Sequence, residues 1–261
     1  MHKQSNNPVA IVTGASTGIG AACAQALAGK GYRVAVNFNR SLQQAQQVVT
    51  RCQQAGTASI LIQGNIAKDE DCRRIVATTI EEWGRIDILV NNAGVTCYAD
   101  QGDLEALNKD DFEYIMGVNL IGTYQMTRAA AAQLEASGEG AIVNVSSHSG
   151  TSGIGSSMAY AASKGALNTM TLSLARNLAP TIRVNAVCPG FVDTDWMSEK
   201  LEAQELSAFK AKVAAISPLQ RIVTPADVAE AVCWFGIDAQ SITGQLLVID
   251  GGTHLTTGNP L

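Results

Sequence analysis

The sequence has 261 residues, of which 46% are hydrophobic and 16% are charged, a balance that excludes a disordered chain and suffices for a large buried core. The net charge of −5 excludes affinity for nucleic acid through phosphate neutralisation, which needs a basic surface. No apolar run approaches the ~18 residues of a membrane helix, and the start of the chain is polar, unlike a signal peptide, so we expect a cytoplasmic protein without membrane or nucleic-acid partners.

Short apolar runs rich in β-branched residues alternate along the chain with longer segments of helical periodicity. The expected strands are Val9–Val12, Arg33–Phe38, Ser59–Ile62, Ile86–Val90, Ala141–Val145, Ile182–Val187 and Gln245–Ile249. The expected helices are Ile19–Ala28, Leu42–Ala55, Asp69–Trp83, Asp110–Ala136, Met158–Leu178 and Ala226–Phe235. Among them, Asp110–Ala136 is predicted to be one long helix.

The expected strands are mostly continuous apolar runs, as in a parallel sheet that helices cover on both faces. Regular alternation of strands and helices with short connections indicates βαβ units. No internal repeat or Pro/Gly-rich linker divides the chain. The predicted fold class is therefore α/β, with one doubly wound, Rossmann-type parallel sheet of about seven strands in a single domain spanning residues 1–261.

A glycine-rich turn, Thr13-Gly14-Ala15-Ser16-Thr17-Gly18-Ile19-Gly20, joins the first expected strand to the first helix. Glycine lets the backbone turn tightly and approach a ligand closely. The N-terminus of the following helix offers free N–H groups and a partial positive charge to an anion. The spacing G-x-x-x-G-x-G is neither a P-loop nor the commoner G-x-G-x-x-G. It predicts a site for the phosphates of a dinucleotide, with a ligand-free turn as the alternative.

The end of the second expected strand bears on which dinucleotide binds. An acidic side chain there favours NAD through the ribose hydroxyls, whereas a basic one pairs with the 2′-phosphate of NADP. The sequence reads Asn37-Phe38-Asn39-Arg40-Ser41 and contains no carboxylate. We therefore predict a preference for NADP(H), with contacts from Asn39, Arg40 and Ser41; the alternatives are use of NAD(H) and an Arg40 that is merely solvated.

A phenol and an amine stand four residues apart in Tyr160-Ala161-Ala162-Ser163-Lys164, at the start of a long expected helix. Residues at this spacing share a helix face. A free phenol has a pKa near 10, and a neighbouring cation lowers that pKa by favouring the phenolate. The pair therefore predicts a proton-transfer centre, although a tyrosine and a lysine at this spacing are also common on protein surfaces.

Two further polar residues fit this centre. Ser147 follows the fifth expected strand, at the end where parallel sheets bind ligands, and its hydroxyl can donate to a carbonyl oxygen. Asn119 lies in an apolar helical stretch, where its amide needs partners: a local backbone bond, or a water that leads to Lys164. A hydrolase is disfavoured, because no G-x-S-x-G motif occurs and His148 is poorly placed as a base for Ser147.

Together these segments resemble the short-chain dehydrogenase/reductase family, most closely its 3-oxoacyl-(acyl-carrier-protein) reductase-type and glucose dehydrogenase-type members. The resemblance extends from Val9 to Gly252. The further motifs that carry it are Asn91-Asn92-Ala93-Gly94, Pro189-Gly190-Phe191-Val192-Asp193-Thr194, Ile242-Thr243-Gly244 and Asp250-Gly251-Gly252. Each motif is weak alone, but in this order and spacing they are highly specific.

The resemblance implies hydride transfer between NADP(H) and a carbonyl or secondary alcohol, with Tyr160 as the acid/base. It implies that Lys164 lowers the pKa of the phenol and holds the nicotinamide ribose. Ser147 would orient the carbonyl and Asn119 would support a proton relay. The implied cofactor contacts are Gly14, Ser16, Gly18, Ile19, Gly20, Asn39, Arg40, Ser41, Asn65, Ile66, Asn92, Ala93, Gly94, Tyr160, Lys164, Pro189, Gly190, Val192 and Thr194.

One position departs from the family pattern. Asn65 stands where the family usually has an aspartate that meets the adenine. Because an amide oxygen also accepts from an exocyclic amine, we expect a similar but weaker contact.

Substrate choice is expected to lie in a lid at about residues 194–218, since loops over a rigid scaffold often carry specificity. The candidate pocket residues are His148, Thr151, Phe191, Trp196 and Met197. Trp196 and Met197 could alternatively serve only to pack the lid. The substrate itself, a small carbonyl or alcohol compound, is not identified by the sequence.

We expect a homotetramer, because the family usually assembles through the two long helices, and alanine-rich faces such as Ala129–Ala132 allow close helix approach. The six cysteines form no C-x-x-C pair and have no histidine at metal-ligand spacing, so we expect free thiols and no metal site. Two alternatives stay open: an NAD-linked sugar or polyol dehydrogenase of the same fold, and a non-catalytic dinucleotide-sensing protein.

Overall fold

The computed structural model describes residues 7–194, 196 and 202–256. Within these ranges seven strands form one sheet, in which every pairing is parallel. The strands are β1 (Val9–Val12), β2 (Arg33–Phe38), β3 (Ser59–Gln63), β4 (Ile88–Asn91), β5 (Gly140–Val145), β6 (Ile182–Pro189) and β7 (Leu246–Ile249). Strands β1, β2, β4 and β5 are buried along their whole length, which explains their continuous apolar sequences.

Helices connect the strands and cover the sheet. In chain order they are α1 (Gly18–Gly29), α2 (Leu42–Gln54), α3 (Asp69–Trp83), α4 (Lys109–Met116), α5 (Thr123–Ala136), α6 (Ser149–Ser152), α7 (Met158–Leu178), α8 (Ala203–Ile216) and α9 (Pro225–Cys233). Short helical turns are η1 (Leu104–Ala106), η2 (Gly117–Gly122), η3 (Trp234–Asp238) and η4 (Thr253–Leu255).

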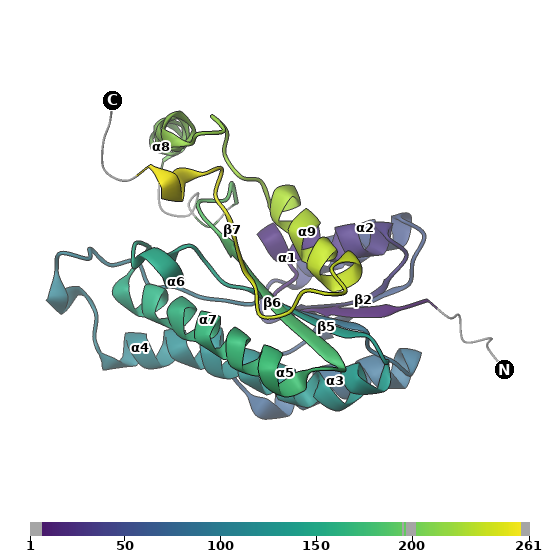
Figure 1. Cartoon of the computed structure of the whole chain (residues 1–261). Helices are drawn as coiled ribbons and strands as arrows, with labels where there is room; N and C mark the ends of the chain where they lie inside the picture. Colours follow the sequence, from purple (N-terminus) through teal and green to yellow (C-terminus); the bar gives the residue numbers. More distant parts are fainter. Residues whose placement is uncertain (1–6, 195, 197–201, 257–261) are drawn as a thin grey trace.

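The sheet lies between two layers of helices (Figure 1). Helices α1, α2 and α9 pack on one face, and α3, α5 and α7 pack on the other. Each face carries its own apolar core: Leu27 and Phe235 are fully buried in the first, Ile142 and Leu134 in the second. This arrangement confirms the predicted α/β fold with a doubly wound parallel sheet of about seven strands.

The strand order is β3-β2-β1-β4-β5-β6-β7, so the chain reverses its direction of travel across the sheet between β1 and β4. In open parallel sheets the crevice at such a reversal, outside the carboxyl ends of the strands, is where ligands bind. The turns that follow β1, β4, β5 and β6 therefore meet at one edge of the sheet. This is the edge to which the sequence assigns the candidate functional residues.

Buried amides tie the central strands to the helices behind them. Asn91 on β4 donates to the Asn144 side chain on β5 at 3.0 Å and to Thr127 on α5 at 3.2 Å. Asn144 in turn donates to Thr171 on α7 at 2.9 Å. A buried amide without partners is costly, so these bonds specify how both strands and both helices fit together.

The predicted long helix over Asp110–Ala136 is confirmed as one helical stretch, but it is not α-helical along its whole length. The range is helical throughout, but η2 is a π-helical turn between α4 and α5. The turn is packed tightly: a Cβ on Gly122 would lie 2.9 Å from the Ile66 carbonyl oxygen, and Asn119 in η2 bonds across to another loop. Such π turns are frequent at functional sites.

Other differences are smaller. Strand β4 begins at Ile88, two positions after the expected Ile86. The short α6 and the fourteen-residue α8 were not expected as helices. The six cysteines all lie in the described ranges and form no disulfide, and five of them are buried. Among the residues that the structure describes, no helix is long and apolar enough to cross a bilayer.

Candidate active site

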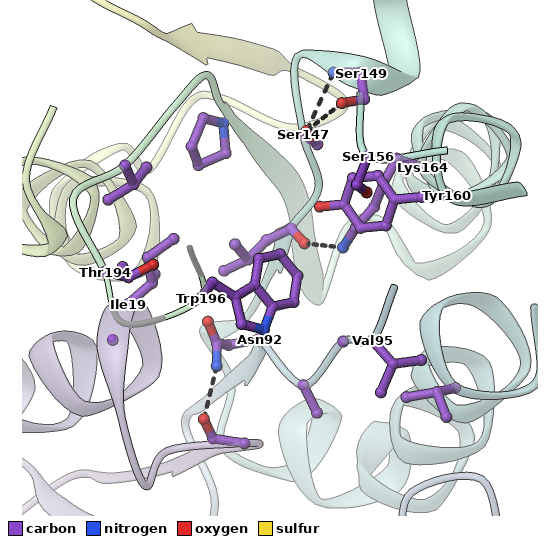
Figure 2. A pocket seen from close by; sticks show the side chains of 18 of the residues that line it. Ile19, Asn92, Val95, Ser147, Ser149, Ser156, Tyr160, Lys164, Thr194 and Trp196 are labelled. Atoms are coloured by element: carbon purple, nitrogen blue, oxygen red, sulfur yellow. Dashed lines mark hydrogen bonds between the residues drawn. The ribbon is translucent and has the colours of Figure 1, made fainter. Parts of the chain in front are cut away.

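A cavity of about 1370 Å³ opens at the carboxyl edge of the sheet. Its wall is built from the segments that follow six of the strands: residues 14–19, 39–41, 64–67, 92–95, 145–149 and 189–194. Figure 2 shows Tyr160 and Lys164 on one side of this cavity, with Ile19 and Thr194 on the other. The cavity therefore joins the glycine-rich turn to the tyrosine–lysine pair.

The glycine-rich turn requires glycine for conformation and for space. Gly14 has a φ of 59°, and a Cβ there would lie 2.7 Å from the Cα of Ala93. At Gly20 a Cβ would lie 2.3 Å from the Asn92 side-chain nitrogen and 2.4 Å from the Gly14 carbonyl oxygen. No larger residue fits at either position, because the turn and the 92–94 loop touch there.

The turn and the loop after β4 are locked to each other by buried Thr13. Its hydroxyl accepts from the backbone N–H groups of Asn92 and Ala93 at 3.0 and 3.1 Å. The Asn92 amide donates back to the carbonyls of Thr13 and Gly14 at 3.0 and 2.9 Å. Thr13 is a residue that the sequence analysis missed, since a threonine at the end of a strand carries no distinctive signal.

Helix α1 begins at Gly18, directly after the turn. The side chain of Thr17, which precedes the helix, makes no capping hydrogen bond, so the first N–H groups of α1 keep their capacity for an external acceptor. Gly14, Ser16, Gly18 and Ile19 all line the cavity at this point. A tight cradle and a helix N-terminus of this kind fit the phosphates of a dinucleotide.

The residues after β2 place two polar, uncharged side chains and one cationic side chain at the cavity. Asn39, Arg40 and Ser41 line it, and Arg40 is exposed. Asn37, just before them, is buried; it accepts from the Gly14 N–H at 3.2 Å and donates to two carbonyls of the β3 segment. It thereby ties the glycine-rich turn to β2 and β3.

Asn65 and Ile66 line the cavity beyond β3, as expected. The Asn65 side-chain oxygen already accepts from the Ala67 N–H at 3.1 Å, and the Asn65 N–H donates to Asp71 at 2.8 Å. The amide oxygen expected to face the adenine is therefore engaged in a local turn and keeps only part of its accepting capacity.

Helix α7 carries the tyrosine–lysine pair, and its start is defined by a cap. The hydroxyl of buried Ser157 accepts from the N–H of Tyr160 at 3.2 Å, so Tyr160 lies in the first turn of the helix. The positive end of the helix dipole stands at this turn. Lys164 follows one turn later, and its amine lies 5.7 Å from the centroid of the Tyr160 ring.

The Lys164 amine is buried and donates to the Val145 carbonyl at the end of β5, at 2.8 Å. Burial lowers the pKa of this amine to about 8, with a smaller opposing effect of the Cys188 thiol. Burial likewise raises the pKa of the Tyr160 phenol to about 12, although its hydrogen bond with Ser147 lowers that pKa in part. The expected lowering of the phenol pKa is thus not observed, because desolvation dominates.

Ser147 stands beside the phenol, two residues beyond β5. Its hydroxyl donates to the Ser149 hydroxyl at 3.1 Å and accepts from the Ser149 N–H, also at 3.1 Å (Figure 2). Ser149 is the first residue of α6 and is itself buried. Ser149 therefore orients the Ser147 hydroxyl, a role that the sequence analysis did not assign to it.

Asn119 in η2 is fully paired with protein groups. Its side-chain oxygen accepts from the Val95 N–H at 2.8 Å, and its nitrogen donates to the Val95 carbonyl and to the Ser163 hydroxyl, both at 3.0 Å. The Ser163 hydroxyl in turn donates to the Tyr160 carbonyl at 2.7 Å. This chain of bonds connects the loop after β4 to the first turn of α7.

The expected pocket residues fall into three groups. His148, Phe191 and Trp196 line the cavity; Trp196 packs edge-on against Tyr160, with ring centroids 6.1 Å apart. Thr151 does not line it: its side chain is exposed, and its hydroxyl donates to the His148 carbonyl at 2.9 Å. Met197 lies outside the described residues.

Most of the residues assigned to the site from the sequence do line one cavity. Besides those already named, Gly94, Pro189, Gly190, Val192 and Thr194 line it. Gly20 and Asn119 do not line it directly and support the wall from behind. Among the described residues, no three histidine, cysteine or carboxylate side chains are grouped so that they could hold a metal ion.

Replacing Lys164 with methionine tests the burial of its charge. The folded-state pKa of about 8 lies below the ordinary 10.5, so the unfolded chain binds more protons between these values and stability rises with pH. We expect the unfolding free energy of the wild type, minus that of the variant, to rise by about 2 kcal/mol between about pH 7 and about pH 10. Urea unfolding at both pH values measures it, and a constant or falling difference would contradict a buried ammonium.

Comparison with known proteins agrees with this geometry. A family model described as enoyl-(acyl carrier protein) reductase matches residues 14–254. A protein of Streptomyces violaceoruber, named as ketoacyl reductase 2 of the granaticin polyketide synthase, is 42% identical over 248 residues, covering 95% of this chain and 96% of that one. The 3-oxoacyl-[acyl-carrier-protein] reductase of a Synechocystis strain is 36% identical over 247 residues, covering 94% and 96%.

A solved structure is similar throughout. The crystal structure of a short-chain dehydrogenase/reductase from Burkholderia xenovorans matches with a TM-score of 0.90 and 41% identity, over 97% of this chain and 100% of that one. The resemblance predicted from the motifs is therefore confirmed. The chain belongs to the short-chain dehydrogenase/reductase family and is an NAD(P)-dependent oxidoreductase that acts on carbonyl or CH–OH groups.

Proposed function

We propose that the protein is an NADP(H)-dependent reductase of small carbonyl compounds, in which Tyr160 supplies the proton. The observation that carries this proposal is the placement of a buried phenol, a buried amine and a serine hydroxyl around one end of a cavity whose other end is a glycine-rich cradle. A buried phenol and a buried amine that both line the cavity are unnecessary in a protein that only senses a dinucleotide, which disfavours that alternative.

The cradle and its surroundings fit the dinucleotide. The Gly14–Ile19 turn and the N-terminus of α1 would hold the phosphates, and the 92–94 loop would lie along the cofactor with Pro189–Thr194. Arg40 would pair with a 2′-phosphate, and Lys164 would hold the nicotinamide ribose. When bound, the dinucleotide supplies the hydride.

The chain's own residues would handle the proton. With its pKa raised to about 12 by burial, the Tyr160 phenol holds its proton at neutral pH and can deliver it from Oη to the carbonyl oxygen. The Ser147 hydroxyl has one proton, which it gives to Ser149 in this structure. On substrate binding it would turn that proton to the carbonyl oxygen, where negative charge develops, while it still accepts from the Ser149 N–H. A protonated phenol suits reduction, so we place the reductive direction first.

Support for the substrate class comes from the relatives. Two of them are named as reductases of ketoacyl or 3-oxoacyl compounds, and we propose that this protein also reduces a 3-oxoacyl compound, a 1,3-dicarbonyl. An NAD-linked sugar or polyol dehydrogenase of the same fold remains the alternative. The coenzyme preference separates the two functions, because NAD lacks the 2′-phosphate with which Arg40 would pair.

Access to the site is proposed to be controlled by the lid at 194–218. Within its described part, Trp196 packs on Tyr160, and Phe209 of α8 packs edge-on against Phe191, with centroids 5.1 Å apart. No residue of α8, all of which the structure describes, is buried. Lys210 of α8 also pairs with Asp193 at 2.5 Å. A helix held by surface contacts of this kind can move without disturbing the core.

We also propose a homotetramer acting in the cytoplasm as a single domain. Large apolar side chains are exposed along α4, η2, α5 and α7, the helices through which the family assembles. They are Phe112, Tyr114, Ile121, Tyr124, Met158 and Leu172.

Substituting Tyr160 with phenylalanine removes only the proton-donating oxygen. We expect kcat for reduction of an acetoacetyl thioester by NADPH to fall about 100- to 10,000-fold, because general acid catalysis is worth that much. Binding of NADPH, followed by its fluorescence, is expected to change less than about threefold. Activity retained at the wild-type level would refute the role of Tyr160.

Substituting Arg40 with leucine tests the coenzyme preference. We expect the ratio of kcat/KM with NADPH to kcat/KM with NADH to fall about tenfold or more, because a charge-assisted hydrogen bond to the 2′-phosphate is lost. Arg51→Leu, on the exposed face of the neighbouring helix α2, is the matched control and should leave the ratio unchanged. A wild type that favours NADH, or an unaltered ratio in Arg40→Leu, would overturn the NADP assignment.

A further inference from the structure

His148 is the residue directly after Ser147, and it lines the same cavity. Its backbone is fixed on two sides: the N–H donates to the Pro189 carbonyl at 2.8 Å, and the carbonyl accepts from the hydroxyls of Thr151 and Ser152 at 2.9 and 3.1 Å. The position of this residue relative to Ser147 is therefore set by α6 and by the end of β6. The His148 side chain is therefore attached to a backbone that hydrogen bonds hold in place.

The ring of His148 has no hydrogen-bond partner among the described residues. It packs beside the ring of His254, with centroids 6.2 Å apart. The two imidazoles differ in their partners: Nδ1 of His254 lies 2.9 Å from both oxygens of the buried Asp250 carboxylate. One imidazole is thus committed to the protein, whereas the other keeps its donor and acceptor for whatever enters the cavity.

The neighbouring hydroxyl limits what His148 can meet. Under the proposed function, Ser147 donates to the oxygen of the reacting carbonyl, and consecutive Cα atoms lie only about 3.8 Å apart. Because His148 and Ser147 also line the same cavity, a second substrate oxygen close to the first is a candidate acceptor for the imidazole N–H. In a 1,3-dicarbonyl a single carbon separates the two carbonyl carbons. The two oxygens are then close together, but the bonds to the carbon between them can still rotate, so each oxygen can meet a different donor.

We infer that His148 is a specificity-determining residue that donates a hydrogen bond to the second, non-reacting carbonyl oxygen of a 1,3-dicarbonyl substrate. The inference rests on the proposed function, because it takes the reacting carbonyl to lie at Ser147 and Tyr160. Compounds whose second carbonyl is absent or lies further along the chain leave the imidazole N–H without its acceptor. A site built to hydrogen-bond a group discriminates strongly against analogues that lack it.

Two thioesters that differ by one methylene test the inference. S-acetoacetyl-N-acetylcysteamine has its ketone and thioester carbonyls in the 1,3 relation, and S-levulinoyl-N-acetylcysteamine has them in the 1,4 relation. Both compounds carry the same functional groups, so the ratio of their kcat/KM values reports the position of the second oxygen. We expect the wild type, with NADPH, to prefer the 1,3 compound by about tenfold or more.

Matched variants assign that preference to one side chain. His148→Phe keeps a ring beside His254 without any N–H, and we expect it to lower the ratio about tenfold. His148→Gln restores a donor and should recover part of the ratio. His254→Gln changes the neighbouring imidazole, which does not line the cavity, and should leave the ratio within about threefold of the wild type.

The possible outcomes distinguish a failure of this inference from a failure of the proposed function. If wild type and His148→Phe reduce both compounds with the same ratio, the proposed reductase activity stands and the role of His148 is refuted. The same holds if the His254 variant loses the preference as fully as His148→Phe. If the wild type reduces neither compound, the proposed function fails and the inference fails with it. Circular dichroism of each variant confirms that the fold is intact.

Discussion

The hydrogen bond from the Lys164 amine to the Val145 carbonyl is the contact on which the rest of the site depends. It joins helix α7 to the carboxyl end of β5, at the edge where the sheet binds ligands. Because Tyr160 lies one turn before Lys164, this bond also determines where the phenol stands. Burying an ammonium with one neutral partner is unfavourable, which is why the pKa of the amine falls to about 8, and the fold as a whole must offset this.

Other buried polar contacts likewise join segments that are remote in sequence. Thr13 joins the glycine-rich turn to the loop after β4. Asn119 joins that loop to α7 through Ser163. These bonds hold the glycine-rich turn and Tyr160 on one frame. Under the proposed function, groups preorganised in this way would need little rearrangement as charge develops during proton and hydride transfer.

Much of this arrangement could be predicted from the sequence, because the signals are local. Apolar β-branched runs identify the strands, and the spacing of Tyr160 and Lys164 places both on one helix face. What could not be predicted depends on tertiary contact. The π turn at Asn119 and the local use of the Asn65 oxygen follow from neighbours that no sequence pattern names. The direction of the Tyr160 pKa depends on burial, which outweighs the hydrogen bond with Ser147.

Under the proposed function, the glycine-rich turn and the buried phenol line one cavity that would take up a dinucleotide and a small ketone together. The most direct test is a crystal structure of the chain with NADPH. The account predicts density along the cavity from the glycine-rich turn to α7, with the nicotinamide ribose within hydrogen-bonding distance of the Lys164 amine. Density elsewhere on the molecule, or an amine and a phenol that both turn away from the nicotinamide, would contradict it.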